Sequence, residues 1–256
     1  MATRANYLLS LDAGTTGVTA MAFDLDLRPV TRAYAEFPQG FPRPGWVEHR
    51  ASDILGAVDA TVADVLGAME APPAAIGITN QRETVFAIDV ESGLALEPGI
   101  VWQDRRTAER CRELEAEGHG VLVQRASGLR LDPYFSATKI EWLLGNSGAV
   151  EAAAKRGTLR FVTVDALIIH HLTGGESLAT DPTNASRTML VDLNRPKEYD
   201  PSLCGLFGVN AAMLPEIQAS ASEFGIARFQ GAGTRGETMS VPITGVLGDQ
   251  QAALFG

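Results

Sequence analysis

The sequence is poor in cysteine and histidine and has no long apolar run. Cys111 and Cys204 stand far apart, which is typical of a reducing compartment and gives no metal-ligand spacing. The four histidines do not pair with cysteine or carboxylate at zinc-site spacings. No stretch approaches the roughly 20 uninterrupted apolar residues of a membrane span, and the N-terminus, MATRANYLL, lacks the apolar run of a signal peptide. We therefore expect a cytoplasmic protein.

Positive charge is also scarce, since 21 lysines and arginines face 31 acidic residues and leave a net charge of -10. This balance argues against nucleic acid or an anionic membrane as the general partner, so any anionic ligand must be met by local donors. The remaining composition, 45% hydrophobic and 20% charged over 256 residues, is that of a soluble globular protein. Neither internal repeats nor a convincing linker divide the chain.

Apolar periodicity predicts a three-stranded meander followed by alternating strands and helices. Strands are expected at residues 8–11, 18–23, 29–36, 75–79, 85–89, 98–102, 161–163, 189–191 and 242–247. Helices are expected at residues 52–69, 107–117, 120–125, 136–144, 149–155, 165–172 and 200–207, with a last helix opening at 248. This order indicates an α/β fold with a mixed β-sheet flanked by helices. The helix-rich middle, about 105–159, is the nearest thing to a secondary lobe.

Four polar residues stand where these helices are expected to begin: Ser52, Ser136, Asp165 and Asp249. Serine and aspartate are favoured as N-caps because their side-chain oxygens accept the free amides of the first helical turn. We therefore expect each of them to cap its helix, and Gly118 to end the helix before it.

The hairpin at residues 8–23 places Asp12 at the end of its first strand and the sequence AGTTG, residues 13–17, in its turn. Glycine permits backbone conformations with φ > 0, so that successive amides point at one anion, and threonine hydroxyls add donors. Such a tip suits phosphate oxygens, with Asp12 holding a hydrated Mg²⁺ that neutralises their charge. An ordinary hairpin with a polar turn explains the same residues equally well.

The stretch ITNQRET, residues 78–84, puts Arg82 and Glu83 just beyond the carboxyl end of a buried strand, where ligands gather in α/β sheets. An arginine and a glutamate side by side offer donors and acceptors to a ligand with several hydroxyls. A surface ion pair at a strand turn is the alternative.

Three further residues are candidates on weaker grounds. Trp102 follows a predicted strand and offers an apolar wall, although a tryptophan there is more often core. Tyr134 precedes a helix and offers a phenolic hydroxyl, or alternatively plugs the core. Asp249 follows the last strand and is suited to accept a proton from a substrate hydroxyl that attacks phosphorus, in addition to or instead of capping its helix.

Together these stretches resemble the N-terminal half of the glycerol kinases, a group of the FGGY carbohydrate kinases in the actin-like ATPase superfamily. The resemblance covers nearly the whole chain and implies an actin-like (ribonuclease H-like) domain. The matching stretches are LDAGTTG at 11–17, PGWVEH at 44–49, IGITNQRET at 76–84, VWQDRRTAE at 101–109, DPYFSATK at 132–139, TNASRTML at 183–190 and GDQQAALFG at 248–256.

The resemblance implies a glycerol site. Arg82 and Glu83 are expected to bind glycerol hydroxyls, Tyr134 and Gln250 to add polar contacts, and Trp102 to pack against the carbon chain.

It also implies a phosphoryl-transfer site that uses ATP and Mg²⁺. Asp249 is expected to be the base for the attacking hydroxyl, and Asp12 to organise Mg²⁺ and phosphate. Thr15 and Thr16 are expected to lie near the transferring γ-phosphate.

The chain departs from the family at two places. Ala13 stands where many glycerol kinases have glutamine, and residues 230–241 differ from the glycine-rich segment that binds a sugar-bisphosphate inhibitor in some bacterial members. We do not expect that regulation here.

Members of the family are about twice as long and hold the adenosine of ATP mainly in a second domain. We therefore expect residues 1–256 to be the N-terminal, substrate-binding domain, with the C-terminal nucleotide-binding domain absent and little or no kinase activity in this chain alone. The intact enzyme is expected to be a homo-oligomer. The alternatives are a kinase for a related polyol or sugar, such as erythritol or a ketose, and a non-catalytic polyol-binding module.

Overall fold

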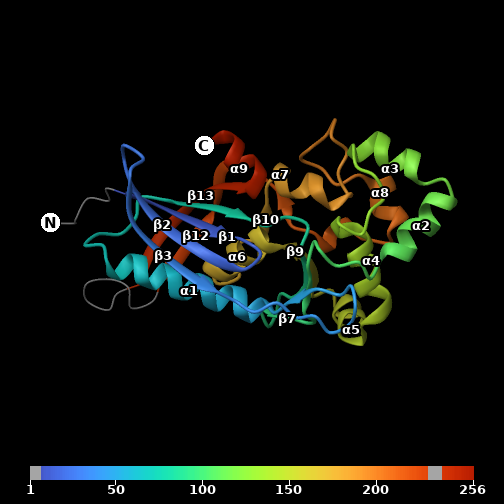
Figure 1. Cartoon of the computed structure of the whole chain (residues 1–256), viewed down its shortest axis with the longest axis horizontal. Coiled ribbons are helices and arrows are strands. Elements are labelled where there is room, and N and C mark those ends of the chain that lie inside the picture. Colours follow the sequence, from blue (N-terminus) through green and yellow to red (C-terminus); the bar gives the residue numbers. More distant parts are fainter. Residues whose placement is uncertain (1–6, 230–237) are drawn as a thin grey trace.

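The main sheet occupies one end of the molecule, as Figure 1 shows. The computed structural model describes residues 7–229 and 238–256. Neighbouring strands of this sheet follow the order β12 (Ala221–Phe229), β13 (Met239–Gly248), β5 (Ile76–Asn80), β1 (Tyr7–Ala13), β2 (Gly17–Asp24) and β3 (Pro29–Glu36).

The three central strands, β13, β5 and β1, are parallel, whereas β12, β2 and β3 pair antiparallel to their neighbours. The sheet is therefore mixed. The register aligns Ala13, Asn80 and Gly248 across the three parallel strands. The carboxyl ends of these three strands consequently lie side by side, and this line of strand ends forms the edge of the sheet at which open α/β sheets bind ligands.

Two helices, α1 (Ala51–Gly67) and α6 (Val164–Leu172), pack on this sheet. Ile54, Val58, Val62 and Val65 of α1 recur every three or four residues, so they share one face of the helix and are buried in the main core. Burying this apolar stripe against the sheet is what stabilises the helix.

A second, smaller sheet joins the main sheet to a helical region. Val85 and Ala87 of β6 (Val85–Asp89) belong to the second core, whereas Phe86 and Ile88 belong to the main core. Both faces of β6 are therefore buried. Its neighbours are β7 (Leu94–Ala95), β8 (Gly99–Ile100), β9 (Leu159–Thr163) and, beyond β8, β4 (Glu48–His49).

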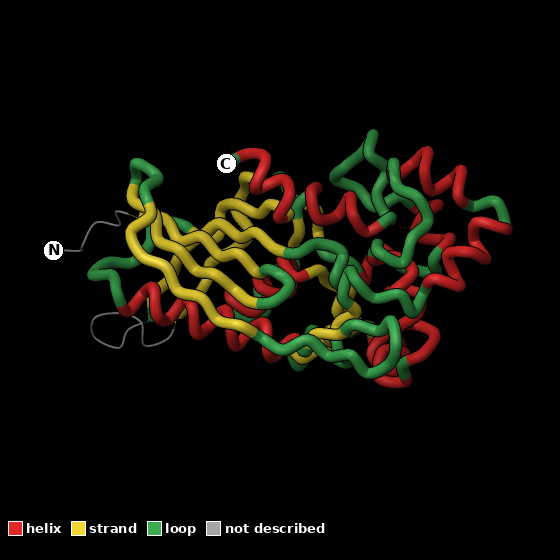
Figure 2. The backbone as a smooth tube through the Cα atoms, viewed as in Figure 1, coloured by secondary structure: helices red, strands yellow, loops and turns green. Residues whose placement is uncertain are grey.

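Most of the remaining helices lie at the opposite end of the molecule from the main sheet (Figure 2). These are α2 (Ala108–Ala116), α3 (Gly120–Ser127), α4 (Ser136–Asn146), α5 (Gly148–Arg156) and α8 (Pro201–Leu206). The remaining helices and strands of the described residues are short. They are α7 (Pro182–Ala185), α9 (Asp249–Phe255), the 3-10 turns Ser186–Thr188 and Ala211–Met213, and the strand pair β10 (Ala179–Thr180) and β11 (Glu216–Ile217).

The sequence predicted the opening meander and most helices correctly. The third strand has the predicted bounds of 29–36, and the hairpin, the long helix after residue 50 and the helices between 107 and 156 are present. Gly118, at a φ of 87°, follows α2 closely, as expected.

Several local predictions were wrong. Residues 189–191 do not form a strand, because Met189 takes a left-handed conformation and Val191 makes only an isolated bridge to Tyr199. The strand expected to run through Trp102 ends at Ile100. The sequence reading also missed β12, in which glycine and charged residues interrupt the apolar alternation.

The four predicted N-caps were also wrong, since each residue lies one or two positions inside its helix. The capping positions belong to Arg50, Phe135, Thr163 and Gly248. The side chains of Ser136, Asp165 and Asp249 make tertiary or local contacts instead, and Ser52 bonds to Asp53.

Within the described residues, no helix is both long and apolar enough to cross a membrane. The predicted departure at residues 230–241 falls mainly outside the residues that the structure describes.

Candidate active site

The turn after β1 is held tightly by its own backbone and by side chains. The amide of Gly14 donates to the carbonyl of Gly17 at 3.0 Å, and Gln81 Nε2 donates to the carbonyl of Gly14 at 3.1 Å. Thr15 Oγ1 accepts a hydrogen bond from the indole Nε1 of Trp102 at 3.0 Å, while Thr16 is exposed. The threonines therefore lie at the open edge of the sheet.

The glycines of this turn act differently from the prediction. Neither Gly14 nor Gly17 has a positive φ, and the Gly14 amide is used inside the turn. Gly17 is needed for close approach, because a Cβ there would lie 2.6 Å from both the Ala35 carbonyl oxygen and the Tyr34 hydroxyl. The proposed cradle of left-handed glycine amides is thus absent from the turn as the structure describes it.

Two carboxylates lie at this edge, Asp12 in β1 and Asp249 directly after β13. The Asp12 side chain is exposed, but partial desolvation by its surroundings raises the pKa of Asp12. The negative charge of Asp249 raises that pKa further. Two acidic groups that repel each other at one edge are suited to share a cation. The described residues contain no cluster of three or more histidine, cysteine or carboxylate side chains that could hold a metal ion.

Arg82 connects two strand ends. Its side chain is only 2% exposed, and its Nε donates to Asp249 Oδ1 at 3.1 Å while Nη1 donates to Gln251 Oε1 at 3.0 Å. Gly248 makes room for it, because a Cβ at that position would lie 2.3 Å from Arg82 Cδ. The absence of a side chain at Gly248 thus permits Arg82 to reach Asp249.

Glu83 is buried beside Arg82 in a left-handed conformation, with a φ of 53°. Its Oε1 accepts a hydrogen bond from Arg187 Nε at 2.7 Å, and Arg82 Nη2 lies 4.0 Å away. Burial raises the pKa of Glu83, while the hydrogen bond from Arg187 and the neighbouring cations lower it. A non-glycine residue with positive φ is held by its surroundings, and such strain is often found at functional sites.

The backbone of Glu83 is held by two donors from α4. Lys139 Nζ donates to the Glu83 carbonyl at 3.0 Å and to the Tyr134 carbonyl at 2.7 Å, and Ser136 Oγ donates to the same Glu83 carbonyl at 3.1 Å. Burial lowers the pKa of the fully buried Lys139 to about 7. Lys139 thus ties together the segments that carry Glu83 and Tyr134.

Aromatic side chains form a wall next to these polar groups. The rings of Trp102 and Tyr134 lie 5.5 Å apart at 60°, and the Arg187 guanidinium lies 5.8 Å from the centre of the Tyr134 ring. Both aromatic residues are partly exposed, so they offer surface to a ligand. Burial raises the pKa of the Tyr134 phenol, which therefore stays protonated at neutral pH.

The structure thus gathers most of the predicted site residues. Arg82 contacts both Asp249 and Glu83, Trp102 contacts Thr15 and Tyr134, and the charge of Asp249 acts on Asp12. Gln250 is different: it is exposed, and among the described residues its side chain makes no hydrogen bond. Its neighbour Gln251 bonds to Arg82 instead.

Arg187 and Lys139 are not among the predicted site residues. Both lie in stretches that already carried the family resemblance, TNASRTML and DPYFSATK. Arg187 reaches Glu83 across 104 positions of sequence, so no local pattern predicts the contact.

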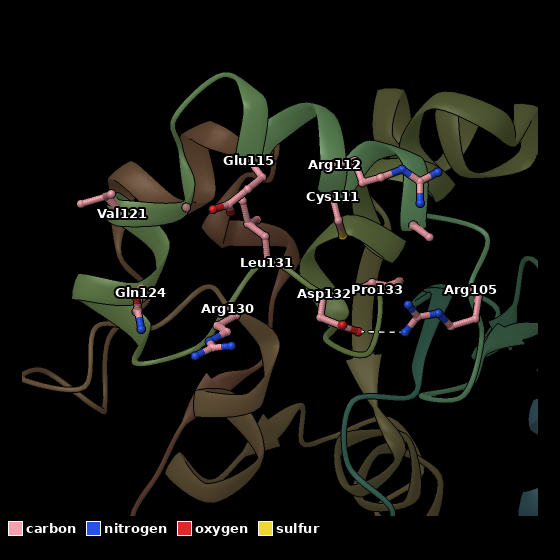
Figure 3. A pocket seen from close by; sticks show the side chains of 12 residues that line it. Arg105, Cys111, Arg112, Glu115, Val121, Gln124, Arg130, Leu131, Asp132 and Pro133 are labelled. Carbon is pink, nitrogen blue, oxygen red and sulfur yellow. Dashed lines mark hydrogen bonds and ion pairs between the residues drawn. The ribbon is translucent and has the colours of Figure 1, made fainter.

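A separate pocket of about 530 Å³ is lined by residues of α2, of α3 and of the segment 130–133 (Figure 3). Asp132 at its edge accepts hydrogen bonds from Arg105 Nη1 at 3.1 Å and from the Tyr134 amide at 2.9 Å. Its other cations, Arg112 and Arg130, do not converge with Arg105 on one point. None of the predicted site residues lines this pocket, so it is not the candidate active site.

Comparison with known proteins decides the family. The profile of the FGGY family of carbohydrate kinases, N-terminal domain, matches residues 7–256. The chain belongs to the FGGY family. The predicted family resemblance is therefore confirmed.

FGGY relatives named as glycerol kinases are similar to this chain. The glycerol kinase of Cereibacter sphaeroides is 48% identical over 253 residues, and glycerol kinase 1 of Pseudomonas aeruginosa is 45% identical over 254 residues; each alignment covers 98% of this chain and 50% of the relative. A crystal structure of Plasmodium falciparum glycerol kinase with ADP superposes with a TM-score of 0.91 at 33% identity, covering 97% of this chain and 49% of that one. The FGGY chain described here thus spans about half the length of these relatives, and the predicted α/β, actin-like fold is confirmed.

Proposed function

We propose that this chain is the glycerol-binding, N-terminal part of an ATP-dependent glycerol kinase, which transfers the γ-phosphate of ATP to a terminal hydroxyl of glycerol and gives glycerol 3-phosphate. One observation carries the proposal. The guanidinium of Arg82 lies between the carboxylates of Asp249 and Glu83. Hydrogen-bond donors and two carboxylates are therefore close together just beyond the ends of β5 and β13.

Glycerol recognition falls to the polar groups at this point. Arg82 donates to the substrate hydroxyls, Glu83 accepts from them, and Tyr134 and Gln250 add polar contacts while Trp102 packs against the carbon chain. A pocket that pairs several hydroxyls rejects analogues that lack one by roughly 10⁴-fold, because its own buried groups are then left unpaired.

Asp249 acts as the base in this proposal. The terminal hydroxyl oxygen attacks the γ-phosphorus, the bond from that phosphorus to the bridging oxygen of ADP breaks, and the hydroxyl proton passes to the Asp249 carboxylate. Arg82 orients this carboxylate through Nε, and the remaining 48% exposure of the Asp249 side chain leaves it accessible to substrate.

The phosphate groups of ATP meet the turn after β1. Thr15 and Thr16 supply hydroxyl groups near the γ-phosphate, and Asp12 organises Mg²⁺, which prefers oxygen ligands and keeps several waters. The residues present fit this ion, because Asp12 is an exposed carboxylate whose pKa is raised partly by a second carboxylate. When bound, the ion neutralises phosphate charge.

The proposed organisation places residues 1–256 in a substrate-binding domain with a helix-rich insertion at about 105–159. A C-terminal nucleotide-binding domain holds the adenosine, and the complete enzyme is a homo-oligomer. "Complete kinase" here means this chain joined to the C-terminal half that its relatives carry. A kinase for erythritol or a ketose, and a polyol-binding module without activity, are the alternatives to test.

Substitution of the proposed base tests this function. In the complete kinase, Asp249→Asn is expected to lower kcat for glycerol by about 10²-fold or more, because the amide cannot accept the proton. Asp64→Asn, an exposed change on α1, is the control and is expected to leave kcat unchanged.

The same assay separates the alternatives. Glycerol, erythritol and a ketose are compared in the complete kinase, and the 256-residue chain alone is expected to show no turnover. Retained activity in Asp249→Asn rejects the base, equal rates on all three substrates reject glycerol specificity, and turnover by the 256-residue chain rejects the domain organisation.

A further inference from the structure

A short polar turn at the start of α7 connects two strand ends of the active site. Thr183 Oγ1 accepts a hydrogen bond from the amide of Gly248 at 2.8 Å, and Asn184 Oδ1 accepts one from Asn80 Nδ2 at 2.9 Å. Gly248 immediately precedes Asp249, and Asn80 lies two residues before Arg82. One turn therefore contacts the strand ends that lead into the proposed base and into the arginine that orients it.

Asp181 fixes the orientation of this turn. Its carboxylate is fully buried and accepts hydrogen bonds from the Thr183 hydroxyl at 2.8 and 2.9 Å, from the Asn184 amide at 3.0 Å and from Ser220 Oγ at 2.7 Å. A hydroxyl has only one proton to donate. Because Thr183 gives that proton to Asp181, a lone pair of its oxygen is directed to the Gly248 amide.

The helix that begins at Asp249 has little else to hold it. None of the residues of α9 is buried in this chain, so apolar packing against residues 7–229 and 238–248 does not fix its start. Among the described residues its polar anchors are the Gly248 amide at Thr183, and Arg82 at Asp249 and Gln251. Removing the Thr183 hydroxyl takes away one of these anchors and leaves Arg82 and the pairing of β13 with β5 to place the base.

We propose that Thr183, oriented by Asp181, is a positioning residue that sets the place of the Asp249 carboxylate relative to Arg82. The inference rests on the proposed role of Asp249 as base. Thr183 itself contacts the backbone before Asp249 and is not assigned to substrate. Misplacing a reacting group by about 1 Å lowers rates by up to about 10²-fold.

A matched pair of substitutions tests the inference in the complete kinase. Thr183→Val keeps the shape and loses the hydroxyl, and Thr183→Ser keeps the hydroxyl and loses the methyl group. We expect Thr183→Val to lower kcat about 10- to 100-fold with an unchanged KM for ATP, and Thr183→Ser to remain within about threefold of the parent. Equal kcat values in the two variants would overturn the inference.

Two controls separate this inference from the proposed function and from loss of folding. Ser220→Ala removes a donor to Asp181 without touching Gly248, so a kcat loss as large as that of Thr183→Val would make the effect one of general stability and reject positioning. An Asp249→Asn variant that keeps its activity rejects the proposed function, whatever Thr183→Val does.

A further measurement uses the unmodified chain and therefore does not depend on whether a variant folds. Hydrogen exchange of the Gly248 amide in the unmodified chain is expected to be slowed, because this amide is bonded to Thr183. Exchange at the rate of an unbonded amide would overturn the inference.

Discussion

Arg82 is held so tightly that its neighbour Gly248 cannot gain a side chain without moving it. A Cβ at residue 248 would lie 2.3 Å from Arg82 Cδ and 2.9 Å from Cγ. These atoms belong to the middle of the arginine, whose guanidinium is bonded to both Asp249 and Gln251, so the side chain has little room to yield.

Gly248→Ala is therefore expected to lower kcat/KM for glycerol by about tenfold or more in the complete kinase, since Arg82 loses its alignment. The backbone of Gly248, at a φ of -60°, suits any residue, so the effect is steric. Gly245→Ala in the same strand is the control, because its Cβ would meet only Gly77 Cα at 4.0 Å. Equal kcat/KM in the two variants would contradict this account of Arg82.

His49 makes stability depend on pH. It is 1% exposed, its Nδ1 lies 3.3 Å from Gln81 Nε2, and burial lowers its pKa to about 4. The unfolded chain takes up this proton near pH 6.5 but the folded chain does not. The contribution of neutral His49 to the free energy of unfolding is therefore fully present above about pH 6.5. It falls as the pH drops toward 4, by at most roughly 3 kcal/mol.

Urea unfolding at several pH values tests this prediction. His49→Gln is expected to show a smaller loss of unfolding free energy between pH 7 and 4.5 than the parent chain. His171→Gln is the control, because His171 is a third exposed and bonded to Asp59. An unchanged pH dependence in His49→Gln would reject the assignment to His49.

At the scale of elements, the sequence predicted what local periodicity determines. The strand at 29–36 alternates along its length, and α1 repeats apolar residues at helical spacing, so both were found with nearly correct bounds. The N-cap predictions were wrong because a serine or aspartate near a helix start has competing partners. Ser136 donates to the Glu83 carbonyl and Asp165 accepts from Thr163 and Thr180, contacts that only the folded chain provides.

In the candidate site too, positions that follow from local sequence were predicted, and contacts that depend on the fold were not. Arg82, Glu83 and Asp249 follow predicted strands, so the rule that ligands bind beyond the carboxyl ends of parallel strands identified their places. Trp102 and Tyr134 were candidates on weaker grounds, and the family resemblance added Gln250. Contacts from the α7 region to these strands span 65 to 104 residues and depend on the fold, so no local pattern predicts the partners of Thr183 and Arg187.

At the scale of the whole molecule, two cores meet at β6 and leave the strand ends of the main sheet open. The main core lies between the sheet and the helices α1 and α6, and the second core lies among the strands and helices around β6 and β9. The candidate site uses residues from both parts, with Asp12 in β1, Arg82 and Asp249 just beyond the ends of β5 and β13, and Tyr134 and Lys139 from the helical region. Correct joining of the two parts is thus a condition for the site.

As the proposed glycerol-binding part of the kinase, this chain is expected to hold a glycerol site that is already formed. The most direct test is an amide and indole NMR titration of the 256-residue chain with glycerol. We predict saturable shifts at Arg82, Glu83 and Tyr134 and at the Trp102 indole, and their loss in Arg82→Met. Absence of shifts at these positions, or identical shifts in Arg82→Met, would contradict the account.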